Sequence, residues 1–197
     1  MKRWVCALLA GVLALVCGAG ALAEEDYDAY YDRFANVEAD ICIGEVGADF
    51  ENSGRSDPFE DCRREEEDNG IVFISRTTSL SVLALVSEDW NGVAAFLVMA
   101  MDPADYGLGL DVLCRLENDY HMIFDSRDES ASCERWLGGL RDEITSCGVQ
   151  GRLQKWETTL DTGSRLQISV TPLPECNRLN AVLYITDEYE IDIYMGA

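Results

Sequence analysis

Histidine is nearly absent from this chain of 197 residues, which contains only His121. A serine or cysteine hydrolase with a histidine base would have to use this one residue, with Asp119 or Asp125 orienting its ring. No G-x-S-x-G motif accompanies it, and a single histidine is more often structural than catalytic. The same shortage disfavours transition-metal centres, and the H-E-x-x-H zinc motif is missing. We therefore expect His121 to have a structural role.

Basic residues are also scarce. The chain holds 15 Lys and Arg against 37 Asp and Glu, which gives a formal net charge of −22. Such a chain repels nucleic acid and anionic membrane surfaces, so neither is an expected partner. A basic protein, a cationic peptide or a metal ion would be attracted instead. The alternative is that the acidic residues only keep an exported protein soluble in a salty medium.

The only long apolar run stands at the start of the sequence. Lys2 and Arg3 precede apolar residues from Trp4 to Val16, and Ala21-Leu22-Ala23 precedes the acidic Glu24. A basic start, an apolar stretch and an A-x-A site are typical of a secretory signal that is cleaved. We expect residues 1–23 to be the signal peptide and the protein to be periplasmic or extracellular.

Other membrane attachments are disfavoured. An uncleaved anchor would need a longer apolar run to span a bilayer, and the residues before Cys17 do not fit a lipoprotein processing site. No later stretch is a candidate, because Ser87-Glu88-Asp89 interrupts the only other apolar region. The remaining chain, residues 24–197, is long enough for a single domain with its own core.

Six cysteines follow the expected signal peptide: Cys42, Cys62, Cys114, Cys133, Cys147 and Cys176. An even number in an exported chain is typical of a disulfide framework. A continuous helix over Ser132–Ser146 would hold Cys133 and Cys147 too far apart to bond. We therefore predict the pairs Cys42–Cys62, Cys114–Cys133 and Cys147–Cys176. If the helix breaks at Gly138-Gly139, the pairs Cys133–Cys147 and Cys114–Cys176 become the alternative.

The apolar stretch from Ile71 to Met101 is expected to form the centre of the core. Asn91-Gly92 suits a two-residue type I′ turn, so the sequence predicts a β-hairpin around it. The predicted opposite pairs are Trp90 with Val93, Val86 with Leu97, and Leu85 with Val98. Both faces of each arm are apolar, so we expect the hairpin to be covered on both sides. One long buried helix is the alternative, although the residues around the turn suit a helix poorly.

Local patterns assign the rest of the chain. The acidic part, residues 24–70, is expected to hold a helix over Asp28–Ala39 and an irregular segment over Gly44–Asn69. The β-rich core, residues 71–197, is expected to contain an inserted helix over Ser132–Ser146 and a loop over Asp102–Gly109. Its further strands are predicted over Leu110–Leu116, Tyr120–Asp125, Leu153–Leu160, Arg165–Leu173, Asn180–Thr186 and Tyr189–Met195. The predicted fold class is α+β: mainly an antiparallel sheet of about seven to nine strands with an N-terminal helix and one inserted helix, stapled by disulfides.

Carboxylates provide the candidate cofactor sites, and Asp26, Asp28 and Asp32 form one of two such clusters. Asp102, Asp105 and Asp111 surround Gly107 and Gly109, and oxygen ligands in such a loop suit Ca²⁺. Their spacing is not that of an EF-hand, so calcium is a candidate rather than a requirement. A second set of acids beside the core strands (Glu88, Asp89, Asp102 and Asp105) could in principle supply the paired carboxylates of a hydrolase.

Tyrosines among acids provide the candidate partner-binding residues: Tyr27, Tyr30, Tyr31, Tyr189 and Tyr194. Tyrosine supplies contact area at low entropic cost, so such a surface could bind a basic partner. Ordinary packing is the alternative. We expect an exported acidic binding protein of the cell envelope with a basic protein or peptide as partner, of inhibitor, immunity or assembly-factor type. A carboxylate-based envelope hydrolase and a calcium-binding envelope protein are the alternatives.

Overall fold

The computed structural model describes residues 27–67, 70–86 and 92–185, with side chains described from Asn36 onward. The chain divides into two compact units, Met1–Tyr31 and Asp32–Ala197. Of the first unit only Tyr27–Tyr31 is described, and it is helical. Everything below concerns the second unit. The expected signal peptide lies outside the described residues, and no helix in the described part is long and apolar enough to span a membrane.

Seven antiparallel strands form one sheet, which confirms the α+β fold class. The strands are β1 (Arg63–Glu67), β2 (Gly70–Ile74), β3 (Leu80–Val86), β4 (Val93–Ala100), β5 (Gln154–Thr159), β6 (Arg165–Pro172) and β7 (Asn177–Tyr184). Their order across the sheet is β1-β2-β3-β4-β7-β6-β5. The strands therefore form two consecutive meanders, β1 to β4 and β5 to β7, which meet where β4 pairs with β7.

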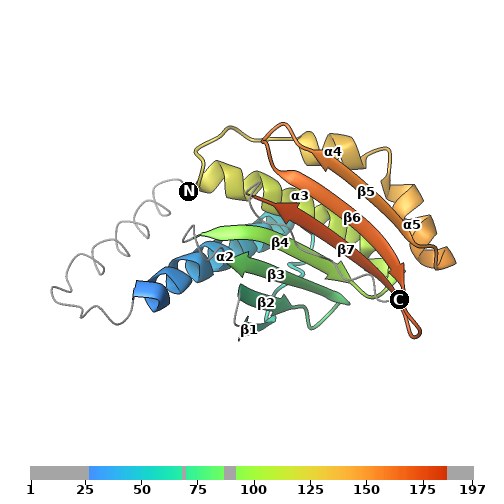
Figure 1. Ribbon diagram of the computed structural model, residues 1–197, viewed down its shortest axis with the longest axis horizontal. Coiled ribbons are helices and arrows are strands. Elements are labelled where there is room, and N and C mark those ends of the chain that lie inside the picture. Colours follow the sequence, from blue (N-terminus) through green and yellow to red (C-terminus); the bar gives the residue numbers. More distant parts are fainter. Residues whose placement is uncertain (1–26, 68–69, 87–91, 186–197) are drawn as a thin grey trace. The chain divides into compact units, whose positions relative to one another are not determined.

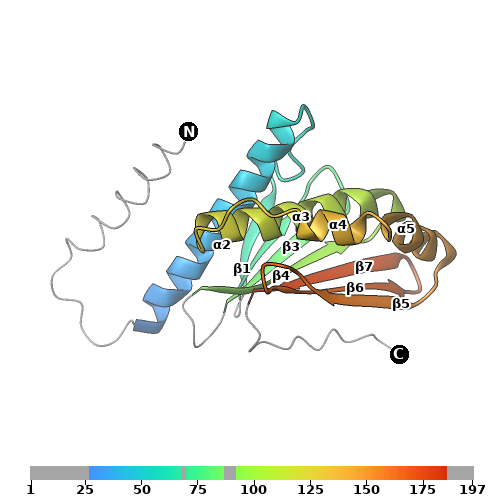
Figure 2. The ribbon, with the colours of Figure 1, turned by 90° about the horizontal axis from the view of Figure 1, so that it is seen from above.

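The helices lie together on one face of this sheet (Figures 1 and 2). They are α2 (Tyr27–Asn52), the short 3₁₀ helix η1 (Pro103–Asp105), α3 (Tyr106–Ile123), α4 (Ser132–Leu137) and α5 (Arg141–Gln150). Alternate residues of each strand point to this covered face. Phe96 and Val98 of β4 share one buried core there with Leu110 and Leu113 of α3 and with Phe50 of α2.

The opposite side of the sheet, called the second face below, has a smaller apolar cluster. Ala95, Val182 and Tyr184 are buried there, with Leu85 and Leu97 packed against them. In the described part of the chain no helix or strand lies over this face (Figure 2). Of the expected cover on both sides of the hairpin, the described elements show the helices on one side, and the cover of the other side stays a prediction.

Helix α3 replaces three predicted elements and is the largest correction. The loop predicted over Asp102–Gly109 and the strands predicted over Leu110–Leu116 and Tyr120–Asp125 form one helical region. The Asp102 side chain accepts a hydrogen bond from Ala104 N (2.9 Å) and so caps η1, which leads directly into α3. Gly109 lies where this helix packs closely against Leu80 of β3. A Cβ at Gly109 would lie 3.2 Å from Leu80 Cδ2.

The hairpin between β3 and β4 exists, but its predicted register was wrong. Val86 lies opposite Val93, Leu85 opposite Ala95 and Leu83 opposite Leu97, with an irregularity between Leu85 and Val86. The connection is thus longer than a two-residue Asn-Gly turn. Residues 87–91 of it, including the predicted turn residue Asn91, lie outside the described residues.

Three further parts of the chain differ from prediction. Helix α2 continues to Asn52, because Cys42, Val46 and Phe50 keep the apolar stripe facing the core. Strand β1, Arg63–Glu67, forms within the segment predicted to be irregular, because it pairs along its whole length with β2. The predicted helix over Ser132–Ser146 is divided into α4 and α5 at Gly138-Gly139.

The C-terminal strands largely follow the prediction. Strands β5, β6 and β7 match three of the predicted ranges to within a few residues, and the turn over Asp161–Ser164 joins β5 to β6. The predicted strand over Tyr189–Met195 lies outside the described residues.

Candidate functional site: a buried histidine cluster at the end of α3

Three segments bring polar side chains together around His121. They are the C-terminal half of α3, the connection from α3 together with the first residue of α4 (residues 124–132) and the turn between β5 and β6 (residues 160–164). The polar residues buried there are Glu117, His121, Ser132, Thr162 and Ser164. Buried polar groups are stable only when hydrogen-bonded, so their partners define what this cluster can do.

Both ring nitrogens of His121 are hydrogen-bonded. Nδ1 lies 2.6 Å from Asp125 Oδ2, and Nε2 lies 2.7 Å from Ser164 Oγ. A carboxylate can only accept, so in the neutral ring Nδ1 carries the proton and Nε2 accepts from the Ser164 hydroxyl. Asp125 is therefore the residue that orients the ring.

The local backbone explains how these residues meet. His121 and Asp125 are four residues apart at the end of α3, on the same side of the helix. The chain then reverses at Ser126, which has a φ of 53°, and Arg127 N donates to His121 O (3.1 Å). The Arg127 side chain also donates to Thr162 O, which holds the β5–β6 turn against α3.

Glu117 lies one helical turn before His121 and is fully buried. Its Oε1 accepts hydrogen bonds from Thr162 Oγ1 (2.8 Å) and Ser132 Oγ (3.3 Å), whereas Oε2 is buried with no hydrogen-bond partner. Burial raises the pKa of Glu117, and the bonds from Thr162 and Ser132 and the nearby His121 only partly oppose this. Protonation of Glu117 is therefore favoured relative to an exposed glutamate.

The order carboxylate, imidazole, hydroxyl is the order found in serine hydrolases. Ser164 is only 2% exposed and His121 only 3% exposed. A substrate carbonyl must come within about 3 Å of the hydroxyl oxygen to react, and in this structure protein atoms cover both side chains. The hydrogen bonds of the cluster join α3 to the β5–β6 turn.

Asp119 does not take part in the hydrogen bonds around His121. It lies on the side of α3 near α2, is 5% exposed, and its Oδ2 has no hydrogen-bond partner. Burial, together with the carboxylates of Asp49 and Glu45 on α2, raises the pKa of Asp119 to about 7, although a hydrogen bond from Asn118 opposes this. The interface between α2 and α3 therefore contains a carboxyl group that titrates near neutral pH.

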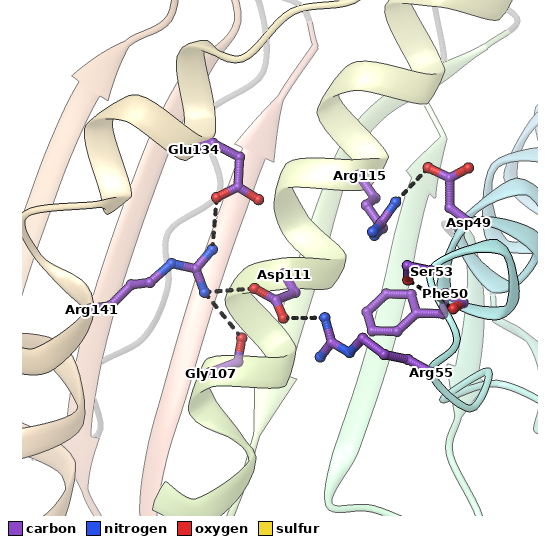
Figure 3. A network of polar contacts seen from close by, with 9 residues as sticks. All are labelled: Asp49, Phe50, Ser53, Arg55, Gly107, Asp111, Arg115, Glu134 and Arg141. Atoms are coloured by element: carbon purple, nitrogen blue, oxygen red, sulfur yellow. Dashed lines mark hydrogen bonds and ion pairs between the residues drawn. The ribbon is translucent and has the colours of Figure 1, made fainter.

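The three aspartates considered for calcium have other partners. Asp102 caps η1, and Asp105 Oδ2 accepts from Ser79 N (2.7 Å). Asp111 lies between two guanidinium groups, with Arg55 and Arg141 each 2.7 Å from one of its oxygens (Figure 3). Among the described residues no group of three His, Cys, Asp or Glu side chains is placed to hold a metal ion. The structure thus gives calcium no ligand set at these positions.

Figure 3 shows that Asp111 belongs to a network that ties the helices together. Arg141 of α5 also contacts Glu134 of α4 (3.1 Å). Arg55, just after α2, stacks over the Phe50 ring at 4.4 Å. Nearby, Arg115 of α3 donates to Asp49 of α2 (2.5 Å). These contacts connect α2, α3, α4 and α5 through charged side chains.

All six cysteines of the described chain are free in the structure, so the predicted disulfides are not formed in it. Cys114 and Cys133 nevertheless form a hydrogen bond, which together with burial raises the pKa of Cys114 well above its usual range. Cys147 donates instead to Gln154 Oε1 (3.2 Å). One predicted pair, Cys114 with Cys133, is thus in close contact even though α4 and α5 are separate helices.

The remaining predicted site residues cannot be compared with the structure, because their side chains are not described in it. Tyr27, Tyr30 and Tyr31 lie in the first turns of α2, where side chains are not described, and Tyr189 and Tyr194 lie outside the described residues. Glu88 and Asp89, considered for a hydrolase, also lie outside them.

Sequence reasoning named His121 and Asp125 but missed Glu117, Thr162 and Ser164. Spacing along α3 could have indicated Glu117, which is four residues before His121. Ser164 is 43 residues away from His121 in sequence, and no local pattern reports such a contact.

No protein-family model matches this chain, and no curated protein or solved structure is similar to it.

Proposed function

We propose that this protein is an exported binding protein with a basic partner, and that the free edge of β1 is the surface that binds it. The observation that carries this proposal is the composition of that edge. Among the described strands β1 pairs with β2 alone; it is largely exposed and ends in Glu65-Glu66-Glu67. A sheet edge offers unpaired backbone groups to an added strand, and acids beside it favour a cationic one.

The ion pairs of the chain support this assignment. Arg64 is held by Asp40 of α2 (2.8 Å) and by Glu66 (2.8 Å), and Arg63 pairs with Glu65. The cations near the edge are therefore already neutralised by neighbouring acids. The exposed acids Glu60 and Asp61 stand just before β1. An approaching partner consequently meets an excess of negative charge.

Alternatively, the charged residues of β1 only protect this edge of the sheet against pairing with other molecules. Charged residues on an edge strand also prevent unwanted pairing between molecules. Protection requires only that charge be present, whereas binding requires that a cationic strand be recognised at this edge more strongly than elsewhere. The two readings therefore predict different results for matched variants.

A peptide-binding assay distinguishes them. The probe is an alternating Lys-Val peptide long enough to span β1, with a Glu-Val peptide as the negative control. We expect the Lys-Val peptide alone to bind, and its affinity to fall as salt is raised, because exposed charges are screened.

The variant Glu65→Gln/Glu66→Gln/Glu67→Gln should weaken binding by about tenfold or more. The control Asp128→Asn/Glu129→Gln/Asp142→Asn removes the same charge from exposed positions elsewhere and should change affinity far less. Equal losses in both variants would show that net charge alone attracts the peptide. Absence of binding to the wild-type protein would refute the proposal.

A further inference from the structure

The backbone groups of Arg64 face the free edge of β1. Ser75, just after β2, donates from its N–H to Leu80 O across the β2–β3 pair (3.0 Å), so its backbone bonds point toward β3. Backbone bonds alternate in direction along an antiparallel strand. Those of Ile74 therefore point toward β1, where Ile74 lies opposite Arg63. The next residue, Arg64, directs its N–H and C=O away from β2, to the side on which none of the described strands lies.

A strand added to this edge would place one of its side chains directly beside that of Arg64. Opposite residues of two antiparallel strands have their Cβ atoms about 5 Å apart, and like charges at that spacing are destabilising. A guanidinium group that was free to extend along the edge would therefore repel a cationic strand. Whether the edge accepts such a strand depends on what holds the Arg64 side chain.

Asp40 of α2 holds this side chain with two hydrogen bonds. Arg64 Nε lies 2.8 Å from Asp40 Oδ1, and Arg64 Nη2 lies 3.1 Å from Asp40 Oδ2, a bidentate geometry that fixes the plane of the guanidinium. Glu66 accepts from the remaining nitrogen, Nη1, at 2.8 Å. Arg64 lies opposite Phe73, which belongs to the core on the helix-covered face. The Arg64 side chain is therefore directed toward α2.

The charge of this group depends on Asp40. Asp40, Arg64 and Glu66 combine one positive with two negative charges, so the paired group is acidic. Without Asp40 the remaining pair is neutral, and the guanidinium keeps only Glu66, which stands on the edge itself. Glu66 is one of the three acids assigned above to the partner. Asp40 thus leaves the edge with a negative charge that a cationic strand can use.

We propose that Asp40 is a positioning residue that makes the β1 edge selective for a cationic strand by holding the Arg64 guanidinium. This inference rests on the function proposed above and extends it to a residue outside β1. The side chains of Arg64 and Asp40 are 36% and 44% exposed. Solvent therefore screens the pair, and a severalfold effect on affinity is expected rather than an absolute one.

Binding of the Lys-Val and Glu-Val peptides to single variants tests this role. Asp40→Asn should weaken binding of the Lys-Val peptide by about three- to tenfold and strengthen binding of the Glu-Val peptide, because the released guanidinium repels one and attracts the other. Asp40→Glu should keep the wild-type preference. The control Glu51→Gln removes an exposed acid from the same helix and should change neither affinity. Weaker binding of both peptides to Asp40→Asn would show that Asp40 only anchors α2 to β1, which would overturn the inference.

A double variant separates the action through Arg64 from the charge of Asp40 alone. In the Arg64→Gln background there is no guanidinium to hold, so adding Asp40→Asn should change the Lys-Val affinity by less than about twofold. The same severalfold loss with and without Arg64 would overturn the inference. Wild-type binding that Asp40→Asn leaves unchanged would also overturn it, while the proposed function would stand. Absence of binding to the wild-type protein would refute both.

Discussion

Asp119 shows how a single buried carboxyl group can make stability depend on pH. Its pKa is raised from 3.8 to about 7 by burial and by Asp49 and Glu45. The folded protein therefore holds this proton more tightly than the unfolded chain does. The contribution to stability is fully present below a pH of about 4 and is lost as the pH rises through about 7.

Replacing Asp119 by Asn should remove this dependence. At pH 8 the Asp119→Asn protein should be more stable than the wild type by on the order of a few kcal/mol, since each pKa unit corresponds to about 1.4 kcal/mol. At pH 4 the two proteins should be nearly equal. Urea unfolding at both pH values measures the difference, with the exposed Asp128→Asn as control. A wild-type protein as stable as Asp119→Asn at pH 8 would contradict the placement of Asp119.

Ser164 is expected to be structural rather than nucleophilic. Its hydroxyl is buried against His121 Nε2 at 2.7 Å, so a fluorophosphonate probe should not label it in the folded protein. Ser164→Ala should lower the free energy of unfolding by about 1–3 kcal/mol, because His121 loses a buried partner. Chemical denaturation checks this, with the exposed Ser56→Ala as control. Stoichiometric labelling that disappears in Ser164→Ala would restore the hydrolase alternative.

Within the single helix α3, replacing each of two glycines by alanine should change stability in opposite directions. A Cβ at Gly109 would lie 3.2 Å from Leu80 Cδ2, whereas a Cβ at Gly107 would meet nothing within 4 Å. Gly109→Ala should destabilise the protein by about 1–3 kcal/mol through overpacking. Gly107→Ala should stabilise it by about 0.5–1 kcal/mol, because alanine loses less entropy in a helix. Thermal unfolding of both variants measures this, and equal effects would contradict the packing of α3 on β3.

The contact between α3 and α4 also bears on the cysteines. Because Cys114 and Cys133 are hydrogen-bonded, we expect that oxidation of the protein joins them first. Peptide mapping without reduction should recover a Cys114–Cys133 linkage. The pairs Cys42–Cys62 and Cys147–Cys176 remain predictions, and the same peptide mapping tests them. A Cys133–Cys147 peptide would show that α4 and α5 pack differently.

The elements that could be predicted from sequence are those with local signals. Strands β5 and β6 were located because the turn Asp161–Ser164 separates two clear strand patterns. Helix α3 was assigned to strands because Gly107 and Gly109 resemble a loop, and its apolar residues fit either period. The register of β3 and β4 was wrong because Asn91-Gly92 is only part of a longer connection.

For the whole molecule, the limit of sequence reasoning lies in contacts between distant segments. The α+β class followed from the mixture of helical and strand patterns. Of the two partners of His121, Asp125 could be named from the sequence because it is four residues away, whereas Ser164 could not because it comes from another part of the fold. The second face was missed for the same reason, since it exists only when β2, β3, β4 and β7 are placed side by side.

The pairing of β4 with β7 has a consequence for how the chain reaches its fold. Within each meander neighbouring strands are consecutive, but Ala95 and Tyr184 are joined across most of the domain. Closing so long a loop is entropically costly, so this pairing should form last and limit the folding rate. Val98→Ala at the seam and Val82→Ala within the first meander both remove buried methyl groups and can be compared by stopped-flow refolding. We expect the seam variant chiefly to speed unfolding, so that a newly made chain spends its longest waiting time as two separate half-sheets.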